Sequence, residues 1–140
     1  MAMRRSSSTH GVIANPPCVD EDRRIAIGYD SGHGVMTAWR FGDGDGDGDG
    51  DDGELEHLWT RAQDHAGHLL RFPSSGQVLS YDFDHEAGLD HVVILDIETG
   101  AELGRAVTGS PVQSVLFPSV GWDGDAYVCT FAAVTRVFTT

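Results

Sequence analysis

Apolar and small or polar residues alternate with a period of two at the start of the ordered part of the chain. Residues 25–29 and 35–41 each place apolar side chains at every second position. Residues 30–34, Asp-Ser-Gly-His-Gly, separate the two runs with turn-forming residues. This pattern predicts a β-hairpin, because alternate side chains of a strand point to opposite faces of the sheet.

Further strands are predicted later in the chain. Residues 77–83 alternate, and residues 91–97 form a continuous apolar run, typical of a strand that is buried on both faces. The other strand candidates are residues 113–117, 126–131 and 134–138. Residues 55–69 fit helical spacing and also fit two short strands, so both interpretations stay open there. Short strands separated by Gly and Pro turns predict an all-β fold.

The composition divides the chain into an N-terminal tail and a domain. Residues 1–23 contain Pro16-Pro17 and no long apolar pattern, so we expect a disordered N-terminal tail. Residues 24–140 are expected to form the domain, with an acidic low-complexity loop at residues 43–53. Trp122, in a predicted turn, is expected to be a packing anchor.

An internal repeat indicates how the strands are grouped. Residues 69–76 and 114–121 share Phe, Pro, Ser and Gly at an offset of 45 residues. A period in the mid-forties is that of a four-stranded propeller blade, and such repeats bury their apolar faces against one another.

Residues 93–103, Val-Ile-Leu-Asp-Ile-Glu-Thr-Gly-Ala-Glu-Leu, carry a more specific pattern. Here the chain resembles the repeat of the PQQ-like, quinoprotein alcohol dehydrogenase-like β-propeller proteins, in which an Asp-x-x-Thr-Gly turn joins two strands. Asp96 is suited to cap this turn by accepting hydrogen bonds from nearby backbone N–H groups. The position at which the family docks a tryptophan is occupied by Gly104, and Trp59 is expected to take the equivalent role one blade earlier.

The resemblance implies an incomplete β-propeller of about two to three four-stranded antiparallel blades. The blades would comprise residues 25–61, 65–108 and part of a third at 112–138, with the acidic tract between the third and fourth strands of the first. Closed propellers have about four blades or more, so we expect a fragment of a larger PQQ-like repeat protein. No quinone-binding residues map onto this chain. The expected function is a non-enzymatic binding or scaffold module whose partners are further propeller blades or another protein.

Charge excludes several classes of partner. The chain has 22 acidic residues against nine basic ones, all arginine, and a formal net charge of −13. An interface for nucleic acid needs a basic face, so we expect no nucleic-acid partner. No apolar run approaches the ~20 residues that span a bilayer. We therefore expect a cytoplasmic protein without a membrane segment or a signal peptide.

Residues 43–56 hold eight of the acidic residues and provide an alternative function. Their spacing fits the calcium loop of EF-hand proteins, so Ca²⁺ is a candidate ligand although no cofactor is assigned. The pattern also fits when it is shifted by two residues, which is a property of the Asp-Gly repeat. The candidate metal ligands in this tract are Asp43, Asp45, Asp47, Asp49 and Glu54.

A second alternative is a metal-dependent enzyme that uses Asp64, His65 and His68. Imidazole and carboxylate groups together can bind a transition metal. On a helix the two histidines would share a face, whereas on a strand they would point in opposite directions. No nucleophile motif accompanies them, so catalytic residues are unknown.

Overall fold

A computed structural model describes residues 16–42, 55–64, 67–108, 110, 118–130 and 133–138. These residues form eleven strands, and the part of the chain that is described contains no helix. All neighbouring strands are antiparallel, and each pairs with the strand next to it in sequence. The prediction of an all-β fold is therefore confirmed.

Three sheets follow one another along the chain. Sheet A has the order β1-β2-β3-β4 and consists of β1 (Cys18–Asp20), β2 (Ile25–Asp30), β3 (Val35–Arg40) and β4 (Glu56–Ala62). Sheet B has the order β5-β6-β7-β8 and consists of β5 (Leu70–Phe72), β6 (Gln77–Asp84), β7 (Leu89–Asp96) and β8 (Glu102–Val107). Sheet C has three strands, β9 (Ser119–Val120), β10 (Asp125–Cys129) and β11 (Val134–Phe138), with β10 in the middle.

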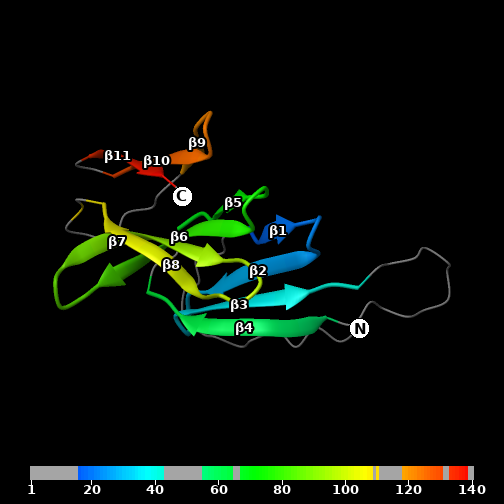
Figure 1. The fold of residues 1–140 in the computed structure, drawn as a ribbon. Coiled ribbons are helices and arrows are strands. Elements are labelled where there is room, and N and C mark those ends of the chain that lie inside the picture. Colours follow the sequence, from blue (N-terminus) through cyan, green and yellow to red (C-terminus); the bar gives the residue numbers. More distant parts are fainter. Residues whose placement is uncertain are drawn as a thin grey trace.

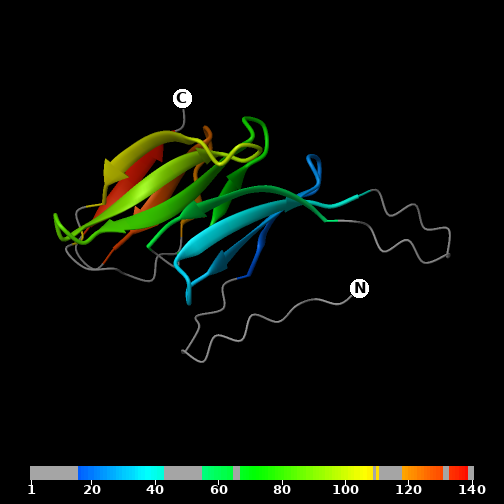
Figure 2. The same ribbon diagram turned by 90° about the horizontal axis from the view of Figure 1, so that it is seen from below.

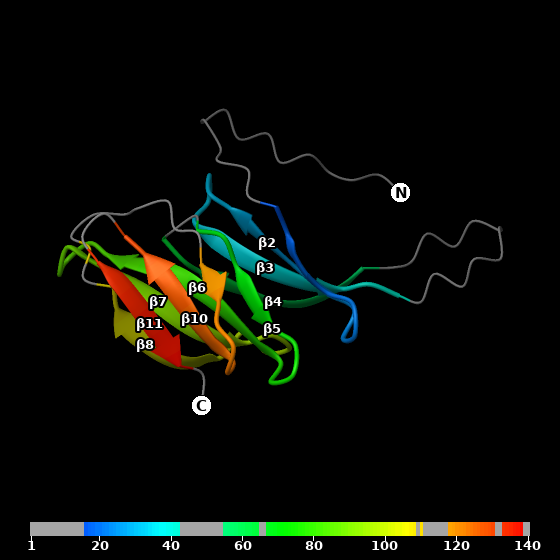
Figure 3. The ribbon, with the colours of Figure 1, turned by 90° about the horizontal axis from the view of Figure 1, so that it is seen from above.

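The sheets form successive layers, with sheet B between sheets A and C (Figure 1). Views from below and above show sheet C (orange and red) against one face of sheet B and sheet A (blue to green) against the other (Figures 2 and 3). Each sheet is a meander of strands that are consecutive in sequence. The sheets are therefore held together by the packing of their faces on one another, because no strand crosses from one sheet to the next.

Two apolar cores hold the layers together. The first core lies between sheets A and B and includes Ile25, Ile27 and Leu95, all fully buried. The second core lies between sheets B and C and includes Leu79 and Val128. Strand β7 contributes to both, which confirms the prediction that residues 91–97 are buried on both faces. Burial of each large side chain contributes about 1.5–3 kcal/mol.

Several local predictions differ from the structure. Cys18–Asp20, placed in the expected disordered tail, form β1 and pair with β2. Within residues 55–69, the described residues favour the strand interpretation, since Glu56–Ala62 form β4. Trp122, the expected packing anchor, is fully exposed. The strand candidate at residues 113–117 lies outside the described residues.

The repeat at an offset of 45 residues does not mark equivalent places. Residues 73–76 form the turn between β5 and β6, whereas Ser119 and Val120 form strand β9 itself. The residue before the second strand of each sheet has a left-handed backbone, with φ of 55° at Arg24, 65° at Gly76 and 74° at Gly124. Gly76 is therefore matched by Gly124 rather than by Gly121, and the predicted register was wrong.

Candidate functional site

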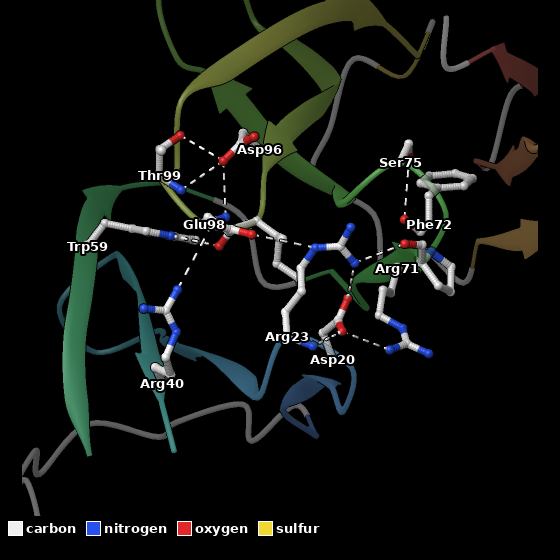
Figure 4. Close-up of polar contacts among 12 residues, drawn as sticks. Asp20, Arg23, Arg40, Trp59, Arg71, Phe72, Ser75, Asp96, Glu98 and Thr99 are labelled. Carbon is white, nitrogen blue, oxygen red and sulfur yellow. Dashed lines mark hydrogen bonds and ion pairs between the residues drawn. The ribbon is translucent and has the colours of Figure 1, made fainter. Parts of the chain in front are cut away.

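The turn between β7 and β8 is built around the carboxylate of Asp96. Its Oδ1 accepts hydrogen bonds from the backbone N–H groups of Glu98 and Thr99, at 3.0 and 2.8 Å, and from Oγ1 of Thr99 at 2.8 Å (Figure 4). The chain leaves the turn through Gly100, whose φ of 68° suits a residue without a Cβ. The predicted role of Asp96 as the cap of an Asp-x-x-Thr-Gly turn is confirmed.

Trp59 of sheet A docks on this turn of sheet B. Its Nε1 donates a hydrogen bond of 3.0 Å to the carbonyl oxygen of Ile97. A methyl group on Gly100 would lie 2.5 Å from Cδ2 of the indole, so the ring rests directly on the glycine backbone. The contact links two sheets across 38 residues of sequence.

Strand register identifies the position in sheet B that corresponds to Trp59. Trp59 pairs with Ala38 immediately before an irregularity between β3 and β4. Gly104 pairs with Ile94 immediately before the matching irregularity between β7 and β8. Gly104 is therefore the structural equivalent of Trp59 in sheet B.

A buried carboxylate joins the first strands of sheets A and B. The side chain of Asp20 is fully buried, and Oδ1 accepts a 2.9 Å hydrogen bond from the backbone N–H of Arg23. Its oxygens lie 3.2 and 3.4 Å from the guanidinium groups of Arg23 and Arg71, which come from the two different sheets (Figure 4). Arg23 also donates to the carbonyl oxygen of Pro73 at 2.9 Å. The sequence did not point to this group, because Asp20 and Arg23 fell in the expected tail.

A second group of charges lies along the seam between β4 and β8. Arg61 donates to the carbonyl oxygen of Gly100 at 3.2 Å and to Glu102 at 3.1 Å. Arg105 donates to both oxygens of Glu102 and to Asp82. The hydrogen bond from Arg105, followed by that from Arg61, lowers the pKa of Glu102 from 4.5 to about 2. The contacts of Arg61 join sheet A to sheet B, whereas those of Arg105 lie within sheet B and pair the carboxylates of Glu102 and Asp82 with a guanidinium.

The metal candidates are only partly described. Asp64 pairs with the imidazole of His85, and its backbone N–H donates to Asp82 at 3.0 Å. His68 is half-buried just before β5, whereas His65 lies outside the described residues. Over the described ranges there is no group of three or more His, Cys, Asp or Glu side chains that could hold a metal ion.

The acidic tract lies between β3 and β4, the third and fourth strands of sheet A. Its candidate calcium ligands, Asp43, Asp45, Asp47, Asp49 and Glu54, all lie outside the described residues. The calcium hypothesis therefore stays a prediction from the sequence.

No protein-family model matches the chain, and comparison with the curated proteins and with the solved structures finds no match either. None of the described segments forms a helix of the length and apolarity that crossing a membrane requires.

Proposed function

We propose that the chain is a non-enzymatic binding or scaffold module of β-propeller type, in which each sheet is a blade. The observation that carries this proposal is the docking of Trp59 on the turn between β7 and β8 of the following sheet. It shows how consecutive meanders in this chain hold one another through a specific side chain as well as through a shared apolar core. In repeat proteins each structural unit packs on its neighbours in this way, and a further unit or a partner can extend the stack.

The resemblance to PQQ-like repeats agrees with this proposal. The family docks a tryptophan in each blade, and here Trp59 contacts the Asp-x-x-Thr-Gly turn of the next sheet. The first strands also meet, because β1 contacts β5 and the Asp20 carboxylate bridges them. We accordingly infer that sheets A and B are complete blades and that sheet C is a blade with three described strands.

The outer face of sheet C is the place where we expect a further blade. Sheet B has apolar clusters on both faces, whereas the exposed residues of sheet C include Val134 and Phe138, which are 69% and 62% exposed. Both point away from the core of sheet C, opposite in direction to the buried Val137. The guanidinium of Arg136 lies over the ring of Phe138, with Cζ 4.3 Å from the ring centroid. An exposed apolar sheet face of this kind favours association.

Sedimentation equilibrium of the purified chain tests the proposal, with a second copy as the available partner. We expect the apparent mass to rise above 15.0 kDa with increasing concentration. The double variant Val134→Asp, Phe138→Asp should remain monomeric, because it places two charges on the association face. Leu103→Asp is the matched control, since Leu103 is 54% exposed but lies on β8, and it should associate like the wild type.

Two results would contradict the proposal. One is a wild-type chain that stays monomeric at every concentration. The other is association that persists unchanged in the double variant, which would place the contact on a different surface.

A further inference from the structure

A cavity lies between sheets B and C, beside Gly104. Its volume is about 220 Å³. Its walls come from three strands, β7, β8 and β11, and are mainly apolar, comprising Val92, Ile94, Gly104, Ala106, Val137 and Phe138. A Cβ on Gly104 would meet no atom within 4 Å, so the hollow begins directly at its backbone.

The corresponding space between sheets A and B is filled. There the equivalent residue is Trp59, and its indole occupies the gap between the sheets. In sheet B the equivalent residue is Gly104, which has no side chain, and the cavity lies beside its partner residue Ile94. The cavity is thus the space that an aromatic side chain takes up at the preceding interface.

We propose that this cavity binds a small planar aromatic molecule of one or two fused rings. An apolar cavity of about 150 Å³ is known to stay dry and to bind benzene, so a larger one can admit a bicyclic ring. Ile94 and Val137 supply aliphatic contact surface, and the cavity corresponds to the place that the Trp59 indole takes at the preceding interface. Phe138 is 62% exposed and therefore marks the side on which the cavity meets solvent.

Titration of the ¹⁵N-labelled chain with indole, followed by ¹H–¹⁵N correlation spectra, tests the proposal. We expect saturable shifts at the amides of Gly104, Ala106 and Val137, and none at Gly28 in sheet A.

Variants at Gly104 locate the site. Gly104→Trp should fill the cavity and abolish the indole shifts. Gly104→Leu is a smaller replacement that serves if the tryptophan variant fails to fold, and it should weaken indole binding by about tenfold or more, since each 1.4 kcal/mol of lost contact is a factor of ten. Gly28→Ala is the control, because its Cβ would lie at an ordinary 3.6 Å from Trp39 and away from the cavity.

The proposal fails if indole at millimolar concentration causes no saturable shift, or if the shifts map to residues remote from β8 and β11. Equal binding to Gly104→Leu and to the wild type would also overturn it.

Discussion

Replacement of Trp59 by alanine tests how strongly sheet A is held to sheet B. The side chain is 8% exposed, so almost its entire surface would be lost from the interface. A buried Trp→Ala change costs about 3–5 kcal/mol, and the lost hydrogen bond to Ile97 accounts for about 1 kcal/mol of that effect. Domains of this kind are stable by ~5–15 kcal/mol, so the variant should lose a large fraction of its free energy of unfolding.

Urea denaturation followed by far-UV circular dichroism measures this loss without relying on tryptophan fluorescence, which the substitution itself changes. Trp122→Ala is the matched control, because Trp122 is fully exposed and its replacement should change stability by no more than ~0.5 kcal/mol. If Trp59→Ala cost less than about 1 kcal/mol, or no more than the control, the reasoning about the interface would be refuted.

Three further predictions concern the turns and the ion pairs. Gly100→Ala and Gly88→Ala both place a side chain at positive φ, which costs about 1–2 kcal/mol of folding free energy. Only the new methyl group at position 100 also meets the indole ring of Trp59, so Gly100→Ala should cost ~1–3 kcal/mol more than Gly88→Ala in urea denaturation. Equal losses of stability would exclude the close contact between Gly100 and Trp59. The pKa of Glu102 is about 2 in the folded state against an ordinary 4.5, so the ionised side chain stabilises the fold by ~0.2–1 kcal/mol above pH 4.5 and loses this effect as the pH falls towards 2. Glu102→Gln should remove that part of the dependence of the melting temperature on acid pH. A pH profile of the melting temperature that is unchanged in the variant would contradict this role of Glu102. Asp20→Asn leaves the guanidinium groups of Arg23 and Arg71 without their buried counter-charge and should lower the free energy of unfolding by about 3 kcal/mol. Glu21→Ala, at the exposed neighbouring position, is the control and should change it by no more than ~0.5 kcal/mol. Similar losses in the two variants would contradict the role of Asp20 as a bridge between the sheets.

Local chemistry made part of this fold predictable. The hairpin of β2 and β3 follows from alternation and from the Asp30 turn, where the carboxylate accepts hydrogen bonds from Gly32 and His33. The Asp96 turn uses the same local device, so it could also be inferred from a few adjacent residues. Such features depend on sequence neighbours alone.

Features that depend on distant partners were harder to predict. A strand of three residues such as Cys18–Asp20 has no readable period, and it is ordered through pairing with β2 and contact with β5. Trp122 was expected to be buried because of its residue type, but its turn projects into solvent.

The predicted repeat failed for a related reason. Matching letters in residues 69–76 and 114–121 suggested one register, whereas the left-handed residues before β6 and β10 define another. The backbone conformation of a turn therefore shows which residues of two sheets correspond more reliably than the types of the turn residues do. The correspondence of Trp59 and Gly104 became certain only when both strand registers were known.

The most direct test of the stacked-sheet account is the environment of the Trp59 indole in solution, measured by NMR. The structure predicts nuclear Overhauser effects between the indole protons and the Hα protons of Gly100, and slow exchange of the Nε1 proton, which is bonded to the carbonyl oxygen of Ile97. A rapidly exchanging Nε1 proton with no contact to Gly100 would show that sheet A does not dock on sheet B, and the proposed blade packing would be contradicted.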